Sequence, residues 1–230
     1  AIEGASLEAN KGAYSYAWMI IFAVIAAIMV LIGLYHIRML PSNQIPSTTK
    51  KTTSEVGREL VAVIANFFTK KHIFYYICFI ILYRLAEGFI MKIAPLFLRA
   101  SREVGGLGLS LKEIGTLNGV FGSAAFVLGS LLAGIYVSKF GLKRTLFTLC
   151  CIFNLPFVAY TFLAVTQPTN VYLIGTCITM EYFGYGFGFV GLTLFMMQQI
   201  APGKHQMSHY AFASGIMNLG VMLPGMVSGY

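Results

Sequence analysis

The sequence contains no aspartate, and charged residues of any kind make up only 10% of its 230 residues. Soluble domains carry about a quarter charged residues, so this composition, with 57% hydrophobic residues, excludes an ordinary soluble protein. The net charge of +8 does not indicate nucleic-acid binding, because the basic residues are scattered between apolar runs and form no single patch. The composition is that of a membrane protein.

Cysteine chemistry and catalytic groupings are also lacking. The four cysteines all lie within apolar runs and form no CxxC spacing: Cys78, Cys150, Cys151 and Cys177. Such thiols are typical of buried apolar side chains rather than of disulfides or metal ligands. His205 and His209 have the spacing of two metal ligands on one helical face, but no acidic or thiol partner is near them in the sequence. No Ser/His/Asp grouping, carboxylate pair or HExxH string occurs. We therefore expect neither an enzyme nor a bound metal or cofactor.

Long apolar runs fill most of the chain. A membrane-spanning helix needs about 20 predominantly apolar residues, and six runs approach that length. They are Ala17–Tyr35, Ile73–Leu98, Ile114–Val137, Leu146–Val165, Val171–Gln198 and a last run from His209 onward. The sequence therefore predicts an all-α, polytopic membrane helical bundle with about six transmembrane helices. Because the chain starts without Met or a signal peptide and stops inside an apolar run, we expect a fragment.

One long polar segment, residues 36–72, separates the first run from the others. Its opening part, Pro41–Thr53, is rich in Pro, Ser, Thr and Lys, which predicts a flexible linker. Thr52 and Glu55 have the spacing of a capping box. The residues that follow place four apolar side chains on one helical face: Leu60, Ile64, Phe67 and Phe68. This pattern is typical of an amphipathic helix in the membrane interface, or of an ordinary connecting helix.

Lysine and arginine predict the side of the membrane on which each loop lies. Ten of them lie in the long segment and in the loops after the third and fifth runs: Arg38, Lys50, Lys51, Arg58, Lys70, Lys71, Lys139, Lys143, Arg144 and Lys204. Four lie on the opposite side: Lys11, Arg99, Arg102 and Lys112. Because cytoplasmic loops carry the excess of basic residues, we expect the long segment to be cytoplasmic and the N-terminal tail to be outside.

Four ionisable residues lie inside apolar runs, where an unpaired charge is costly. Arg84, Glu87 and Lys92 belong to the second run, and Glu181 belongs to the fifth. Arg84 and Glu87 are three residues apart and can pair on one helix, whereas Glu181 needs Arg84 or Lys92 from another helix, or else a proton. One interpretation is a polar patch on a substrate and proton pathway. The other is a structural ion pair that locks two helices together.

Glycines recur in the third and fifth runs. They are Gly115, Gly119, Gly122 and Gly129 in the third, and Gly184, Gly186, Gly188 and Gly191 in the fifth. A nucleotide-binding loop is excluded, because that fingerprint follows a strand in a soluble βαβ unit. Glycines in membrane helices permit close packing or local bending, and the spacing of the first three predicts a packing face.

The loop between the third and fourth runs resembles the signature of the major facilitator superfamily, G-x-x-x-D-[RK]-x-G-x-[RK]-[RK]. The matching positions are Gly134, Ser138, Lys139, Gly141, Lys143 and Arg144. Ser138 stands where the family has an acidic residue, which puts a charge-relay role at that position in doubt. We expect the three basic residues to lie at the cytoplasmic ends of the two helices and to gate transport rather than bind substrate.

The resemblance also implies a division of the chain. The first run resembles family helix six, the next five resemble helices seven to eleven, and helix twelve is missing. Residues 1–35 are then an outer tail and the last helix of the N-terminal half. Residues 36–72 are the cytoplasmic linker, and residues 73–230 are the C-terminal transmembrane bundle without its last helix.

Several strings resemble the AmpG-type muropeptide permeases and their acetyl-CoA transporter relatives: RLAEGFIMKIAPLFLRA, GGLGLSLKEIG, MEYFGYGFGF and HYAFASGIM. This resemblance implies proton-coupled import of anhydro-sugar peptides across a bacterial inner membrane, with a small solute, protons and the lipid bilayer as partners. Two alternatives stay open, namely a transporter-derived membrane sensor or scaffold and an integral-membrane acyltransferase-type enzyme. A scaffold has little need of costly buried charge. The enzyme would need a catalytic grouping that the sequence does not offer.

Overall fold

A computed structural model describes residues 2–39, 52–155 and 157–227, with side chains from residue 15 onward. The chain divides into two compact units, Ala1–Thr52 and Thr53–Tyr230. The predicted linker Pro41–Thr53 lies almost wholly outside the described residues. All regular structure in the described residues is helical, as the apolar runs predict.

The first unit contains one helix, α1 (Ile2–Met39). Its apolar part, Ser15–Met39, is 25 residues long and extends the predicted run at both ends. At 1.5 Å per residue this part is about 37 Å long, which exceeds the roughly 30 Å hydrocarbon core of a bilayer. The length and composition therefore allow α1 to cross a membrane.

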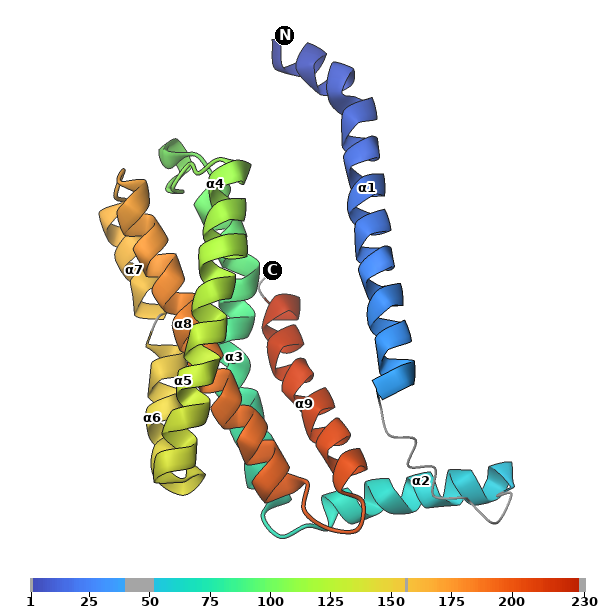
Figure 1. Ribbon diagram of the computed structural model, residues 1–230. Coiled ribbons are helices and arrows are strands. Elements are labelled where there is room, and N and C mark those ends of the chain that lie inside the picture. The colour runs from blue at the N-terminus through green and yellow to red at the C-terminus, as the bar shows by residue number, and fades with distance from the viewer. Residues whose placement is uncertain (1, 40–51, 156, 228–230) are drawn as a thin grey trace. The chain divides into compact units, whose positions relative to one another are not determined.

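The second unit contains the remaining helices (Figure 1). They are α2 (Thr53–Phe68), α3 (Ile73–Arg99), η1 (Arg102–Val104), α4 (Leu111–Thr116), η2 (Leu117–Gly122), α5 (Ser123–Phe140), α6 (Leu142–Asn154), α7 (Phe157–Thr166), α8 (Val171–Phe195), η3 (Met196–Ile200) and α9 (Gln206–Val227). η2 and η3 are π-helical, and α4, η2 and α5 follow one another without a break.

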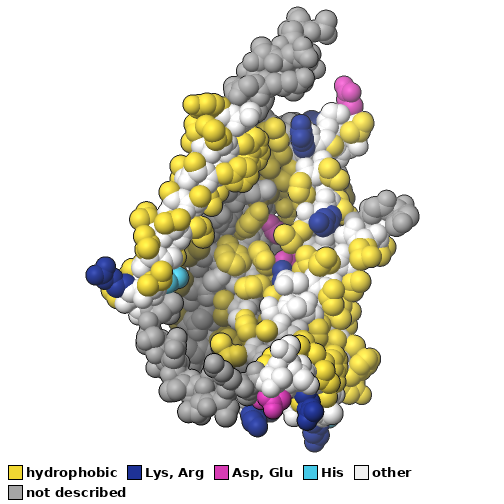
Figure 2. Space-filling view, turned by 90° about the vertical axis from the view of Figure 1, so that its right-hand side faces the viewer, with side chains coloured by type: hydrophobic (Ala, Val, Ile, Leu, Met, Phe, Trp, Pro, Cys, Tyr) yellow, Lys and Arg dark blue, Asp and Glu magenta, His cyan; other side chains and the backbone are white. Residues whose placement is uncertain are grey.

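Five helical stretches of the described residues are long and apolar enough to cross a membrane. They are Ser15–Met39, Ile73–Arg99, Leu111–Phe140, Leu142–Thr166 and Gln206–Val227, and they correspond to five of the six predicted runs. Figure 2 shows hydrophobic side chains over most of the described surface on the side drawn, as a surface in contact with lipid requires.

The fifth predicted run forms α8 with the expected beginning and with 25 residues, but it is not among these five stretches. The reason lies in its sequence, because Glu181 and several tyrosines and glycines replace the aliphatic residues of an ordinary span. α8 compensates by packing inside the bundle, where it contacts α5, α6 and α7.

The core lies where α8 meets α3, α5, α6 and α9. Ile80, Leu149, Leu192 and Met196 are fully buried there. A second cluster of buried side chains joins the end of α3 to α7 and the start of α8: Leu98, Leu107, Leu109, Leu163, Ile174 and Ile178. Two separate clusters of buried side chains thus hold the helices of this unit together.

Helix α2 runs crosswise to the long helices (Figure 1). Its buried face is formed by Val63 and Phe67. Phe67 is 1% exposed, and the centroid of its ring lies 5.7 Å from that of Phe212 on α9. Leu60 and Phe68, which the sequence analysis placed on the apolar face, are 58% exposed. Phe67 of the predicted apolar face therefore packs against α9, while Leu60 and Phe68 of the same face remain exposed. The exposed apolar side chains of α2 and its crosswise direction favour the interfacial interpretation over an ordinary connector.

The connection between α2 and α3 is tied to the end of η3, the segment that follows α8. The ammonium group of Lys70 donates hydrogen bonds to the backbone carbonyls of Ile200 and Pro202, the latter at 2.8 Å. Carbonyls at the end of a helix lack intrahelical donors, so a lysine is a suitable partner for them.

Glycines let α5 and α8 touch through their backbones. A β-carbon added at Gly129 would lie 2.3 Å from the carbonyl oxygen of Phe183, and one at Gly186 would lie 2.1 Å from that of Phe126. Ser130 donates a hydrogen bond to the Gly186 carbonyl across the same contact, at 3.2 Å. The predicted close packing of these glycines is confirmed.

The predicted packing face on the third run is only partly correct. Gly122 packs against Tyr182, whose ring would lie 2.9 Å from an added β-carbon. Gly115 and Gly119 have nothing within 4 Å of that position among the described residues. The i, i+4, i+7 spacing assumes a regular α-helix, whereas the π-helical segment η2 interrupts that regularity between Gly115 and Gly122 and changes which residues share a face.

We expect Gly186→Ala to destabilise the bundle by about 1–3 kcal/mol, the usual cost of overpacking, because its methyl group meets backbone atoms of Phe126. Thermal unfolding of the purified protein in detergent measures the effect. Gly215→Ala on α9 is the matched control, because nothing lies within 4 Å of its β-carbon position among the described residues. Equal unfolding temperatures for the two variants would contradict the close α5–α8 contact.

Candidate functional site

A buried ion pair lies in the middle of α3. The guanidinium group of Arg84 donates two hydrogen bonds to the Glu87 carboxylate, at 2.7 Å from Nε and 2.5 Å from Nη2. Arg84 is 5% exposed and Glu87 is 3% exposed. The three-residue spacing places both side chains on one helix face, as predicted. This two-point contact is the favourable geometry for a guanidinium and a carboxylate, and it offsets part of the cost of burying two charges.

Aromatic side chains of α8 surround the pair. The Tyr185 hydroxyl lies 3.4 Å from Nη2 of Arg84, and the Phe189 ring centroid lies 5.5 Å from the guanidinium carbon. One residue away on α3, the Tyr83 hydroxyl donates a 2.8 Å hydrogen bond to the Gly188 carbonyl. The sequence analysis missed these partners. The sequence did hold a usable signal. Tyr185 and Phe189 are four residues apart and so share one face of a helix, and a buried tyrosine hydroxyl on that face needs a polar partner.

Glu181 lies on α8, close enough to Glu87 for the two carboxyl groups to interact electrostatically. Tyr160 of α7 is a second electrostatic neighbour of Glu181. Neither Arg84 nor Lys92 forms an ion pair with Glu181 within the part of the chain that the structure describes. The cation proposed for Glu181 from the sequence is therefore absent in this conformation, because Arg84 is taken by Glu87. The group consists of one guanidinium and two carboxyl groups, of which Arg84 and Glu87 are in direct contact.

Lys92 does not join this group. It lies two turns along α3 from Arg84, about 12 Å at 1.5 Å per residue, and its side chain is exposed. It runs beside α9, where a β-carbon added at Gly225 would lie 2.9 Å from its Cε. Lys92 has no carboxylate partner among the described residues. The four predicted residues thus form a cluster of three and a separate, accessible cation.

The loop that carries the superfamily signature is a single residue, Gly141, between α5 and α6. Its backbone φ angle of +79° is one that residues other than glycine rarely adopt, which explains the glycine at this position. Its N–H closes α5 by donating to the Val137 carbonyl at 2.8 Å. Ser138 donates a 2.8 Å hydrogen bond to the carbonyl of Ile135 on its own helix. The link between the two helices is therefore short and stiff.

The basic residues of this loop point to its surface. Lys139, Lys143 and Arg144 are exposed, and the Lys139 ammonium lies 5.6 Å from the centroid of the Phe140 ring. Gly134, the first position of the signature, has nothing within 4 Å of its β-carbon position among the described residues. The signature thus combines a tight turn with an accessible basic surface.

His205 and His209 belong to the contact between α2 and α9. Their ring centroids lie 6.0 Å apart, and His209 is 1% exposed and packs 5.7 Å from the Phe67 ring. No group of three or more His, Cys, Asp or Glu side chains that would hold a metal ion occurs within the described ranges. His209 thus packs against α2 in this conformation.

The sequence of this chain also matches a known protein family. The family described as Major Facilitator Superfamily matches residues 11–229. The chain belongs to the major facilitator superfamily. This superfamily is one of integral membrane transporters and not of enzymes. The resemblance inferred from the loop signature is confirmed.

Two similar proteins carry the same name, Anhydromuropeptide permease, one from Escherichia coli strain K12 and the other from Escherichia coli O157:H7. Each is 23% identical to this chain over 185 residues, which is 80% of the chain and 36% of the relative. The resemblance to muropeptide permeases that the sequence strings indicated is therefore confirmed. The chain spans about a third of the length of these curated relatives.

The Arg84–Glu87 pair allows a test of structural against functional roles. We expect Arg84→Met or Glu87→Met alone to destabilise the protein by about 3–5 kcal/mol, because each leaves a buried charge without its partner. The double variant removes both charges and should regain most of the lost stability. Unfolding in detergent and uptake by proteoliposomes are measured for all three variants in the full-length protein.

If the pair belongs to the transport pathway, the double variant should be folded but inactive. The double Cys150→Ser, Cys151→Ser variant serves as a control for two substitutions on a neighbouring helix. Recovery of uptake together with stability would show that the pair only locks the bundle.

A second expectation concerns the loop. Lys139→Gln should slow maximal uptake several-fold and leave the half-saturating substrate concentration nearly unchanged, because the loop constrains helix movement rather than the binding site. Initial uptake rates over a range of substrate concentrations separate the two constants. Lys71→Gln, which removes an exposed basic side chain from another loop, is the control. A large rise in half-saturation at an unchanged maximal rate would refute a gating role.

Proposed function

We propose that the full protein is a secondary transporter that imports a muropeptide or a related solute together with protons across the inner membrane of a bacterium. The observation that carries this proposal is the group of one guanidinium and two carboxyl groups where α3 faces α8. Such charges are costly at membrane depth and are typical of substrate and ion pathways. The name of the two similar permeases supports the substrate class.

Proton coupling rests on Glu181. Arg84 is already paired with Glu87, so an ionised Glu181 would add a second negative charge next to Glu87 in a medium of low dielectric constant. A conformation that opens this region to water, or brings a cation near, favours the ionised carboxylate, and a closed conformation favours the protonated one. Alternation between the two states links proton movement to helix movement.

Substrate recognition has a separate source of charge. Lys92 is exposed and has no carboxylate partner among the described residues, so it is available to an anionic group of a solute. Its position about 12 Å along α3 from Arg84 separates anion recognition from proton exchange on the same helix. This arrangement suits a solute that carries carboxylates, such as a peptide with an acidic terminus.

The helix register that we propose follows the order of the elements. α1 is family helix six, and α3 is helix seven. The continuous run from α4 to α5 is helix eight, α6 and α7 are helix nine, and α8 and α9 are helices ten and eleven. The family match over residues 11–229 supports this register. Residues 36–72 then connect the two halves of the transporter on the cytoplasmic side.

Glu181→Gln tests the coupling proposal, because glutamine keeps the shape of the side chain but cannot exchange a proton. We expect the variant to bind substrate and to exchange it down its gradient, but to lose accumulation driven by a pH gradient. Uptake of labelled muropeptide by proteoliposomes of the full-length protein, with and without a pH gradient, gives both quantities.

Glu103→Gln is the matched control, because Glu103 lies in the exposed segment η1. It should accumulate substrate as the parent protein does. If Glu181→Gln also accumulates substrate normally, the residue is structural and coupling takes place elsewhere. If the parent protein transports no muropeptide at all, the substrate assignment fails while the exchange assay with other solutes still tests coupling.

A further inference from the structure

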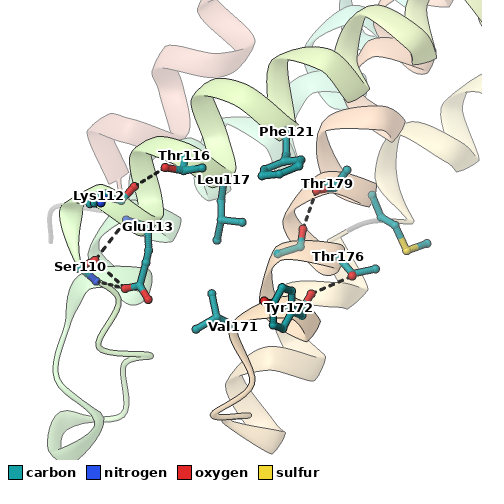
Figure 3. Close-up of a pocket in the computed structure, with 12 residues that line it drawn as sticks. Ser110, Lys112, Glu113, Thr116, Leu117, Phe121, Val171, Tyr172, Thr176 and Thr179 are labelled. Atoms are coloured by element: carbon teal, nitrogen blue, oxygen red, sulfur yellow. Dashed lines mark hydrogen bonds between the residues drawn. The ribbon is translucent and has the colours of Figure 1, made fainter.

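Two adjoining cavities form a groove on one face of the second unit, away from the buried ion pair. The first has a volume of about 730 Å³ and lies between the α4–η2 run and α8 (Figure 3). The second, of about 680 Å³, lies between α5, α6, α7 and α8. Thr179 and Met180 line both cavities, so the two adjoin at this part of α8. Each volume lies within the roughly 300–1,000 Å³ of pockets that bind small molecules.

The groove changes from polar to apolar along its length. Ser110, Lys112 and Glu113 line the first cavity where the span Leu111–Phe140 begins, at the level of the lipid head groups. Farther along, Leu117 and Val171 point toward each other across the cavity (Figure 3). The second cavity is lined almost entirely by apolar side chains: Ala125, Leu128, Ile152, Leu155, Val158, Ala159, Met180 and Phe183.

The hydroxyl groups inside the groove do not require water. Thr176 donates a 2.9 Å hydrogen bond to the carbonyl of Tyr172, and Thr179 donates one of 2.7 Å to that of Gly175. Both donors are therefore satisfied within α8, and the threonines present little unpaired polarity to an apolar occupant. The groove is thus suited to a hydrocarbon chain over most of its length.

The polar end carries one charge of each sign. The Glu113 carboxylate is held in place by the backbone N–H and the hydroxyl of Ser110, at 2.8 and 2.7 Å. Lys112 has no carboxylate partner within salt-bridge distance among the described residues. A head group that carries both a phosphate and a primary ammonium complements this pair, because the phosphate suits lysine and the ammonium suits glutamate.

We propose that this groove is a binding site for a zwitterionic phospholipid with a primary-amine head group. The phosphate lies at Lys112 and the ammonium at Glu113. One acyl chain passes between Leu117 and Val171, reaches Met180 and ends in the second cavity. The bilayer supplies this ligand directly, since the groove runs along helices whose surroundings are hydrocarbon. The site is independent of the substrate pathway.

Brominated lipids, which quench tryptophan fluorescence on contact, test this site. The full-length protein, with Trp18 and any other tryptophan replaced by Phe, carries the reporter Phe121→Trp inside the groove. A second protein carries Leu131→Trp, at a residue of α5 that is 61% exposed and does not line either cavity. Each is reconstituted with increasing fractions of acyl-brominated phosphatidylethanolamine, phosphatidylcholine or phosphatidylglycerol.

We expect half-maximal quenching of Phe121→Trp at a fraction of brominated phosphatidylethanolamine about two- to fivefold lower than that of the other two lipids. This ratio is the affinity difference that one exposed ion pair usually contributes. Leu131→Trp should respond equally to all three. Glu113→Gln keeps the helix cap, since glutamine also serves in a capping box, but removes the charge. It should abolish the preference of the groove reporter for phosphatidylethanolamine over phosphatidylcholine.

Two outcomes would overturn the proposal. Equal quenching of both reporters by all three lipids would mean that the groove has only the ordinary contact of any lipid-facing surface. Absence of quenching at Phe121→Trp, with normal quenching at Leu131→Trp, would mean that another part of the protein fills the groove. Neither outcome depends on whether the protein transports muropeptides, because the readout is fluorescence rather than uptake.

Discussion

Where α5 crosses α8, the two backbones are separated by no side chain, because Gly129 faces the Phe183 carbonyl and Gly186 faces the Phe126 carbonyl. In a bilayer, helices gain little from burying apolar surface against one another, so such close van der Waals contact is a main source of their association. The contact fixes both the position and the rotation of α8. Other helices then pack on a surface already set, as α6 does when Phe153 lies against Gly188.

The rotation of α8 also determines which side chains meet the charges of α3. With its glycines against α5 and α6, α8 presents Tyr185 and Phe189 to Arg84. The carbonyl of Gly188, left accessible by the absence of a side chain, accepts the Tyr83 hydroxyl. The buried polar group therefore depends on the glycines as much as on the charged residues. A transporter that moves α8 must change this set of contacts as a whole.

The sequence was a good guide to what depends on local composition. Apolar length predicted the helices, and the three-residue spacing predicted the Arg84–Glu87 pair. It was a poor guide to rotation about each helix axis, which tertiary packing decides. For this reason Gly115 and Gly119 lie outside the predicted packing face.

The composition of α8 has a consequence for the making of the protein. A helix that enters the bilayer alone must be apolar enough to leave water for lipid, and a glutamate near its centre opposes that step. α8 meets this difficulty with tyrosines and glycines that favour contact with protein over contact with lipid. Its partners α3, α5, α6 and α7 all precede it in the chain and leave the ribosome earlier. We therefore expect the helices synthesised before α8 to assist its membrane insertion, which makes chain order part of how the protein reaches its folded state.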